Sequence, residues 1–385
     1  MTPSVQRVAA LSASLCLIGC VTPAGAIDRV VDSSHGPMRV ETVVAGLDHP
    51  WALAFLPDGA LLVTERPGRL RLLAPGAALS DPLAGVPPVF AEDQGGLLDV
   101  AIDPDFAANR LVYLSFAEPG PDGTNGTAVA RGRLSEDGTA LEGTTVIFAQ
   151  RPKVDSSKHF GSRLVFDGAG HLYVTLGERS DEAFRDQAQD LDSHLGKIVR
   201  LFPDGSVPPD NPFVGEPGAL PEIWSYGHRN VQAAAINPAT GVLWEIEHGP
   251  RGGDELNVVA PGANYGWPLV SYGINYWGTP VGTGAAEMPG VTPPIFQWTP
   301  VIAPSGMMFY DGDAFPDWQG DLFVGGLRSS ALVRLDVDGG AAREAERLID
   351  DLGLRIRDVQ QGPDGAIWLV TDEDDGAVLR LSPGS

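Results

Sequence analysis

The feature that most constrains this chain is a strand–turn–strand theme that recurs along almost its whole length. Each copy is an apolar run, a turn rich in Pro, Asp and Gly, and a second strand, often followed by a third. Six copies at spacings of roughly 45 to 75 residues, with little helical periodicity between them, indicate a repeat architecture. The sequence therefore predicts an all-β fold, a six-bladed β-propeller with one four-stranded blade per copy. The copies cover residues 51–64, 97–115, 162–201, 231–246, 305–335 and 357–381.

One strand-like segment, residues 38–44 with the sequence MRVETVV, stands alone before the first copy. We expect it to add to the final blade. A strand there would join the two ends of the chain and remove the unpaired edges at the seam of the ring.

Three long insertions interrupt the strands, at residues 149–160, 178–195 and 266–299. In a propeller such excursions gather on one rim and build a binding surface. The formal charge of −24 argues against nucleic acid or an anionic membrane as a partner, because both require a basic face.

The N-terminal residues 1–26 are predicted to be a signal peptide, leaving residues 27–385 as the propeller domain. An apolar run follows Arg7 and leads to Ala24-Gly25-Ala26, a small-x-small cleavage site. The competing interpretation is a lipobox ending at Cys20, which would give a lipid-anchored N-terminus. We favour cleavage after Ala26, and either route predicts a periplasmic or secreted protein.

Both cysteines, Cys16 and Cys20, fall within this segment. Cleavage after Ala26 thus excludes disulfides, thiolate chemistry, cysteine metal sites and a covalent c-type haem from the mature chain. No later stretch is long and apolar enough to cross a bilayer.

The polar residues with the clearest chemistry flank one predicted hairpin. Strands at 231–236 and 242–246 surround the turn 237–241, and this geometry returns the clusters 227–230 and 247–255 to the same end of a sheet. That end carries a guanidinium, an amide, carboxylates and a glycine-rich loop with free carbonyls. Such groups suit an oxygen-liganded cation beside an anion-binding arginine.

Six motifs occur in an order that resembles one known family, the soluble aldose sugar dehydrogenases that depend on pyrroloquinoline quinone (PQQ), the family of soluble quinoprotein glucose dehydrogenase. The resemblance spans essentially the whole mature chain and implies a six-bladed propeller. The motifs are QGGLLDV at 94–100, HFGSRLVFDG at 159–168, GHRN at 227–230, EHGP with GGDE at 247–255, NYGWP at 264–268 and RIRDV at 355–359.

The resemblance implies that His159 is the general base, taking the proton of the sugar C1 hydroxyl while hydride passes to C5 of the quinone. It places Glu178 as the acid that orients His159, with Glu standing where the family has Asp. Histidine titrates near neutral pH, which permits this role, although a histidine is more simply a loop or core residue without the family match.

The resemblance also implies a PQQ pocket. Acidic residues (50) far outnumber basic ones (26) in this chain, so arginines in these motifs stand out. Their planar forks suit the three carboxylates of PQQ, although surface salt bridges would explain them equally well without the family. Arg328 stands where the family usually has lysine. Trp267 and Trp298 could line the cleft. The expected cofactor-binding residues are Gln94, Arg229, Asn230, Arg328, Arg355, Arg357 and Trp298.

Calcium is the metal that the resemblance implies, held by the backbone carbonyls of Gly249 and Pro250 and by PQQ. Glu255 and the carbonyl of Tyr265 resemble the ligands of a second, structural calcium, with Asp254 nearby. Hard oxygen ligands favour calcium over zinc. Read alone, this glycine-rich stretch is simply a tight loop.

The function that the resemblance implies is oxidation of the C1 hydroxyl of aldoses to lactones, with electrons passed to a separate acceptor because no haem motif is present. Two alternatives stay open from the residues. One is a calcium-dependent propeller lactonase, which would not need four arginines around its cleft. The other is a non-catalytic secreted propeller that binds a peptide or glycan.

Overall fold

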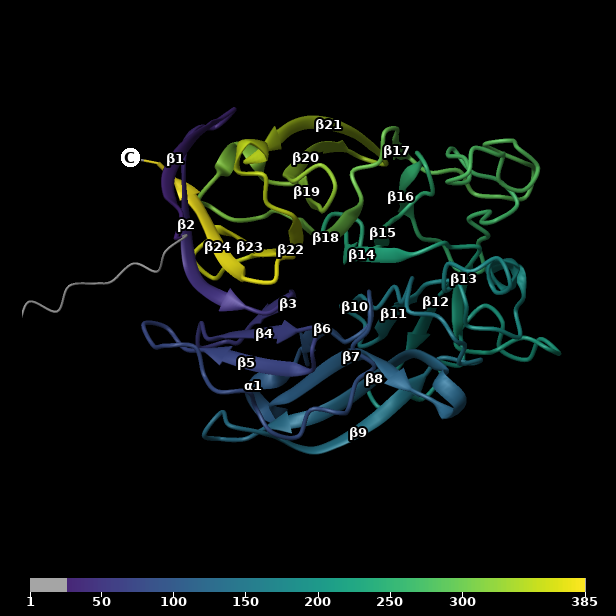
Figure 1. Ribbon diagram of the computed structural model, residues 1–385, viewed down its shortest axis with the longest axis horizontal. Helices are drawn as coiled ribbons and strands as arrows, with labels where there is room; N and C mark the ends of the chain where they lie inside the picture. Colours follow the sequence, from purple (N-terminus) through teal and green to yellow (C-terminus); the bar gives the residue numbers. More distant parts are fainter. Residues whose placement is uncertain (1–25, 385) are drawn as a thin grey trace, which may run out of the picture.

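The computed structural model of the chain describes residues 26–384, which form a ring of six antiparallel sheets (Figure 1). The colours advance around the ring in sequence order, so each sheet is built from a local stretch of chain. The predicted six-bladed propeller is confirmed. Cys16, Cys20 and all of the predicted signal segment except Ala26 lie outside the described residues.

Four of the six blades have the four strands predicted for each copy. The second blade has β6 (Leu97–Ile102), β7 (Leu111–Pro119), β8 (Asn125–Leu134) and β9 (Leu141–Ala149), and the third has β10 (Leu164–Phe166), β11 (Leu172–Leu176), β12 (Lys197–Leu201) and β13 (Ile223–Tyr226). The fourth has β14 (Val231–Ile236), β15 (Leu243–Glu247), β16 (Asp254–Val258) and β17 (Phe296–Trp298), and the fifth has β18 (Pro304–Phe309), β19 (Leu322–Gly326), β20 (Ala331–Asp338) and β21 (Ala341–Leu348).

The first blade departs from the prediction because it has three strands, β3 (Pro50–Phe55), β4 (Leu61–Glu65) and β5 (Arg69–Leu73). The chain after β5 follows the edge for a few residues, with the Leu83 amide donating to the Leu70 carbonyl at 2.8 Å. It forms no regular strand because residues 74–96 hold four prolines and four glycines, which interrupt a ladder.

The sixth blade closes the ring as predicted. It contains β22 (Ile356–Gln361), β23 (Ile367–Thr371) and β24 (Gly376–Pro383), and β2 (Gly36–Leu47) pairs with β24 in antiparallel register, Val40 opposite Leu381. A further strand, β1 (Asp28–Ser33), pairs outside β2. The purple and yellow ends of the chain therefore share one sheet (Figure 1).

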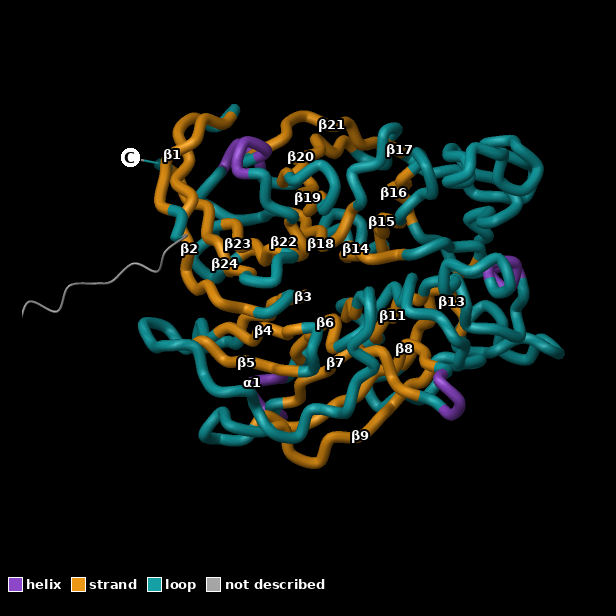
Figure 2. The backbone as a smooth tube through the Cα atoms, viewed as in Figure 1, coloured by secondary structure: helices purple, strands orange, loops and turns teal. Residues whose placement is uncertain are grey.

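Helices are short and lie in the connections (Figure 2). They are α1 (Phe106–Asn109) and the 3₁₀ turns η1 (Pro121–Gly123), η2 (Arg185–Gln189), η3 (Pro316–Trp318) and η4 (Asp350–Leu352). Within residues 26–384, no helix has the length and apolar character that a membrane crossing would need.

Apolar side chains fill the spaces between neighbouring blades. Trp244 and Ile246 of the fourth blade pack with Met307 and Val324 of the fifth, and all four are at most 4% exposed. Burying one such aliphatic side chain is worth about 1.5–3 kcal/mol, so each interface between blades fixes their relative position. The loops at the ends of the blades are thereby set on a rigid frame.

The long insertions meet on one rim, as predicted. Ser156, in the insertion at 149–160, donates through Oγ to the carbonyl of Arg179 at 2.6 Å. Arg185, in the insertion at 178–195, donates to Asn275 Oδ1 at 3.2 Å. The third insertion, 266–299, is thus joined to the second, and the three surround one region of the surface.

Candidate functional site

The hairpin of β14 and β15 brings the two polar clusters together as the sequence predicted. Its turn is closed by the Gly241 amide, which donates to the Asn237 carbonyl at 2.8 Å. At the other end, Arg229 Nη1 donates to the carbonyls of His248 and Gly249 at 2.9 and 2.8 Å. A buried guanidinium therefore sits directly on the glycine-rich loop.

A histidine–carboxylate pair lies beside this arginine. His159 Nδ1 is 2.6 Å from Glu178 Oε2, and the same oxygen accepts from the Ser180 amide at 2.9 Å. The longer side chain of Glu178 thus reaches the histidine. With Nδ1 held by the carboxylate, Nε2 is the ring nitrogen left to exchange a proton.

Electrostatics keep the imidazole neutral near pH 7. Burial lowers the pKa of His159, and the positive charge of Arg229 lowers it further, while Glu178 opposes both effects. Burial raises the pKa of Glu178, but His159 and Arg229 outweigh it and the pKa lies below its usual value. The pair is therefore a neutral imidazole and a carboxylate, the state that a general base needs.

Gln94 and Asn230, predicted to contact a ligand, hydrogen-bond to the loop that carries His159. Gln94 Oε1 accepts from the His159 amide at 2.9 Å, and Asn230 Oδ1 accepts from the Gly161 amide at 3.0 Å. Their side-chain oxygens are thus used to position the base. Their NH₂ groups remain available as donors to a ligand.

The other predicted arginines surround an adjoining cleft made of two cavities. The larger, about 610 Å³, is lined by Gly249, Pro250, Arg328 and Arg355 among others. The second, about 330 Å³, includes Arg355, Arg357 and Gln94, and both cavities reach His248 and Leu327. The blade-end loops therefore bring the predicted arginines and the glycine loop to one place.

Asp372, which the sequence analysis did not single out, holds two of these arginines. Its Oδ2 accepts from Arg355 Nη2 and from Arg357 Nη2, each at 2.9 Å. Burial raises the pKa of Asp372, but Arg357 and Arg355 outweigh this and keep it well below its usual range. The carboxylate is thus charged and fixes the direction of both guanidinium groups.

These residues fit a polycarboxylate cofactor. The Nε atoms of Arg229 and Arg357 are buried and have no hydrogen-bond partner within residues 26–384. An unpaired buried N–H is costly, so an anionic oxygen is the partner that such donors need. Three carboxylates on one planar ligand would supply such partners.

The glycine loop fits an oxygen-liganded cation. A Cβ on Gly249 would lie 2.2 Å from the Gly253 carbonyl and 2.3 Å from the Gly252 carbonyl, so only glycine is accommodated. The Gly249 carbonyl accepts one hydrogen bond from Arg229, and its second lone pair remains for a ligand bond. Backbone carbonyls of this kind suit calcium.

The prediction for Trp298 needs correction. Its side chain is 3% exposed in the core between the fourth and fifth blades, and its Nε1 donates to Glu344 at 2.7 Å. The register of β17 directs it there, away from the cleft. Trp267 lies beside Arg229, with its ring 5.1 Å from the guanidinium carbon, but it lines neither of the two cavities.

The residues proposed for a second calcium line a different cavity from Arg328, Arg355 and Arg357. Glu255 and Tyr265 line a cavity of about 300 Å³, where burial and the neighbouring Glu247 raise the pKa of Glu255 well above its usual value. An uncompensated carboxylate in this position would be stabilised by a cation. Asp254 instead braces the loop, accepting from the amides of Gly249, Ile302 and Ala303 at 2.8–2.9 Å.

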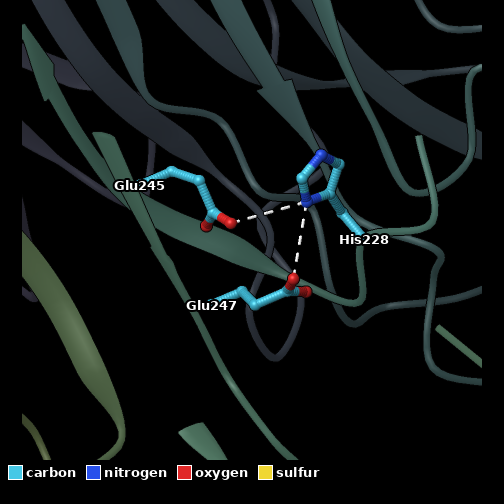
Figure 3. A group of neighbouring side chains, drawn as sticks. All are labelled: His228, Glu245 and Glu247. Carbon is cyan, nitrogen blue, oxygen red and sulfur yellow. Dashed lines mark hydrogen bonds and ion pairs between the residues drawn. The ribbon is translucent and has the colours of Figure 1, made fainter. Parts of the chain in front are cut away.

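One cluster was missed by the sequence analysis. His228, Glu245 and Glu247 converge in the interior, with both carboxylates directed at one imidazole nitrogen (Figure 3). Burial lowers the pKa of His228, but the two carboxylates outweigh it and raise it to about 9. Alternation along β15 was the available signal, because it places Glu245 and Glu247 on the same face.

Comparison with known proteins gives concordant results. A profile of the glucose/sorbosone dehydrogenase family matches residues 47–380. The aldose sugar dehydrogenase YliI of Escherichia coli is 50% identical over 348 residues, covering 90% of this chain and 93% of that protein. The crystal structure of the soluble E. coli aldose sugar dehydrogenase in its apo form has a TM-score of 0.87 at 49% identity, covering 90% of this chain and all of the other.

A cofactor-bound structure is also similar. The PQQ-bound form of an aldose sugar dehydrogenase from Streptomyces coelicolor superimposes with a TM-score of 0.74 at 30% identity, covering 94% of this chain and 99% of that one.

Proposed function

The chain belongs to the glucose/sorbosone dehydrogenase family, and we propose that it oxidises the C1 hydroxyl of aldose sugars to lactones with PQQ and calcium. The coarser assignment, an oxidoreductase acting on sugars, follows from the family. The finer one is supported chiefly by the His159–Glu178 pair, which lies beside an arginine-lined cleft and a carbonyl-rich loop.

The residues of the chain have separate tasks in this proposal. His159 Nε2 takes the proton of the C1 hydroxyl, and Glu178 holds Nδ1–H and stabilises the imidazolium that forms. Bound PQQ supplies the two-electron acceptor, and bound calcium polarises it. The carboxylates of PQQ would be held by Arg229, Arg328, Arg355 and Arg357, and calcium by the carbonyls of Gly249 and Pro250.

Further parts of the proposal concern partners and location. The electrons leave to a separate acceptor, and Glu255 with the Tyr265 carbonyl holds a second, structural calcium. We place the mature protein, residues 27–385, in the periplasm or outside the cell. N-terminal sequencing of exported protein tests the cleavage site, since a blocked N-terminus at Cys20 would indicate lipidation instead.

Reconstitution tests the central claim. Apo protein is mixed with PQQ and calcium, and dye reduction is measured over a panel of aldoses, with His159→Ala alongside. We expect turnover in the wild type and its collapse in the variant, while PQQ binding, followed by absorbance, survives.

Each rival has its own signature in the same assays. Lactone hydrolysis without PQQ would favour the lactonase. A protein that binds a glycan or peptide and reduces no dye with any sugar would favour the binding propeller. Retained turnover in His159→Ala would remove that residue from its assigned role.

A further inference from the structure

The cluster of His228, Glu245 and Glu247 is not used by the mechanism above. All three side chains are fully or almost fully buried, and their ligand atoms lie within 4.8 Å of one another. His228 precedes Arg229 at the end of the third blade, whereas both carboxylates come from β15. The cluster (Figure 3) therefore links the end of the third blade to the fourth, and Glu247 contacts the amide of Arg229.

The distances within the cluster are unusual for hydrogen bonds. His228 Nδ1 lies 3.4 Å from Glu247 Oε1 and 3.6 Å from Glu245 Oε1. Charge-assisted N–H···O bonds are normally about 2.7–2.9 Å. In contrast, ligand atoms bonded at about 2.0–2.1 Å around a tetrahedral ion are roughly 3.3–3.4 Å apart. The two nitrogen–oxygen separations are therefore long for charge-assisted hydrogen bonds and close to those between ligands of one ion.

Each member also has an outer partner of the kind that orients metal ligands. His228 Nε2 is 2.8 Å from Ser225 Oγ, so the ring can donate there and present a bare Nδ1. Glu245 Oε1 accepts from Asn257 Nδ2 at 2.7 Å. Glu247 Oε2 accepts from the Arg229 amide.

Two buried oxygens beside the cluster add an independent observation. Glu245 Oε2 and Asn257 Oδ1 belong to fully buried side chains and have no hydrogen-bond partner in the described part of the chain. Buried polar atoms are rarely left unsatisfied in folded proteins. A cation bound by the cluster would give one of these oxygens a partner and complete a four-ligand set.

We propose that His228, Glu245 and Glu247 bind one divalent transition-metal ion of the zinc type, with a structural role. One imidazole and two carboxylates form a mixed nitrogen and oxygen set, which suits zinc or cobalt, whereas calcium prefers oxygen alone. The ion neutralises both carboxylates. It also fixes Glu247, and through the Arg229 amide it fixes the start of β14.

This site differs from both calcium sites of the proposed function. Those sites use Gly249 and Pro250, or Glu255 and Tyr265, and none of these residues belongs to the cluster. Tyr265 instead stacks on the His228 ring, with centroids 4.7 Å apart. The proposal does not depend on PQQ or on a sugar, so its test is read without activity.

The experiment uses tag-free mature protein, residues 27–385, first stripped with a chelator and then saturated with calcium to fill the oxygen sites. This form lacks Cys16 and Cys20, whose thiolates would also bind zinc. Cobalt(II) or zinc(II) is added, and bound metal is measured by elemental analysis after gel filtration. For cobalt, visible absorption reports a nitrogen ligand. We expect about one equivalent per chain in the wild type, with a higher unfolding temperature in the loaded protein.

Two variants test whether the metal binds at this cluster. Glu245→Gln keeps the side-chain shape and removes one ligand, and we expect its affinity for zinc to fall at least about tenfold. Glu222→Gln, in the separate buried pair with His194, is the matched control and should retain the full equivalent. Circular dichroism of each variant checks that the fold is intact.

Three results would overturn the proposal. They are no stoichiometric zinc or cobalt on calcium-saturated wild type, equal affinity in folded Glu245→Gln, or loss of the metal in Glu222→Gln but not in Glu245→Gln. The wild-type measurement decides the question even where a variant fails to fold.

Discussion

Replacing Glu178 by Gln separates charge from geometry at the proposed base. Glu178 Oε2 accepts from both His159 Nδ1 and the Ser180 amide. A glutamine can place its single amide oxygen in that position and keep both hydrogen bonds. The substitution therefore removes the negative charge while leaving the imidazole in the same orientation.

The cost follows from the imidazolium that forms when His159 takes a proton. Two unit charges about 4 Å apart attract by about 4 kcal/mol at the effective dielectric constant of 20 that describes protein sites. The amide dipole of glutamine retains part of this attraction, so we expect the variant to lose about 2–4 kcal/mol of transition-state stabilisation. At 1.36 kcal/mol per tenfold, kcat/KM should fall by roughly 30- to 1,000-fold.

The pH dependence supplies a second readout. Only neutral His159 can act as base, so kcat/KM rises with pH through the pKa of the histidine. The Glu178 carboxylate raises that pKa, and the glutamine variant loses this contribution. The acid limb of the profile should therefore move to lower pH in Glu178→Gln, even though the maximum rate is lower.

The assay is dye-linked oxidation of glucose by reconstituted protein between pH 4 and 9, with Glu222→Gln as the control. Glu222 pairs with His194 at 2.9 Å, outside the cleft, and its substitution should change kcat/KM less than about threefold. An acid limb that moves upward in Glu178→Gln, or a loss no larger than that of the control, would refute the reasoning.

Three further predictions concern the framework. Gly249→Ala should abolish calcium-dependent reconstitution with an intact circular dichroism spectrum, because the added Cβ meets two carbonyls of the loop; calcium titration by calorimetry tests this. Lys197→Met should lower the free energy of unfolding by about 2–4 kcal/mol, since three backbone carbonyls at 2.7–3.0 Å lose their donor; urea denaturation measures it. Glu222→Gln should be less stable than wild type at pH 7, because His194 lowers the pKa of Glu222 to about 2 despite burial. This stabilisation is lost when Glu222 is protonated, so the difference in stability should vanish as the pH falls from about 4.5 to 2. Thermal unfolding measured across this pH range checks it.

The ring itself was predictable because its cause is periodic. Each copy carries its own apolar runs and turn residues, and local patterns of this kind fix both the strands and their order. The closing strand was predictable for the same reason, since MRVETVV had no partner in its own copy. The missing fourth strand of the first blade was not predictable. Prolines in residues 74–96 oppose strand formation, but their effect depends on whether they face a neighbouring strand or solvent, which the sequence does not show.

The site was predictable where a motif contained the residue and not where packing decided its direction. His159, Glu178 and the four arginines meet as expected. Trp298 does not, since a single residue on β17 faces the core or the cleft according to register, which short sequences leave open. Asp372 was missed because it begins an acidic run, DEDD, that is typical of an exposed loop. Its role exists only because its amide pairs with the Arg355 carbonyl at 2.9 Å.

The same contacts explain how the base is held. His159 has a φ of 51°, a left-handed conformation that costs a non-glycine residue of order 1–3 kcal/mol. The His159 amide donates to Gln94. A Cβ on Gly177 would lie 2.1 Å from the His159 carbonyl oxygen, so the chain after β11 packs closely against the loop that carries His159. Segments before β6 and after β11 thus impose this backbone on His159.

The position of Glu178 is fixed by Arg229, in the loop between the third and fourth blades. The Glu178 amide donates to the Arg229 carbonyl at 2.9 Å, so the carboxylate and the arginine move together. Base, orienting acid and guanidinium are therefore positioned by contacts within the protein itself. Groups fixed in advance need little reorganisation when charge develops, which is where most of the catalytic gain of such a site arises. Loosening the Gln94 contact should consequently reduce kcat more than it weakens substrate binding.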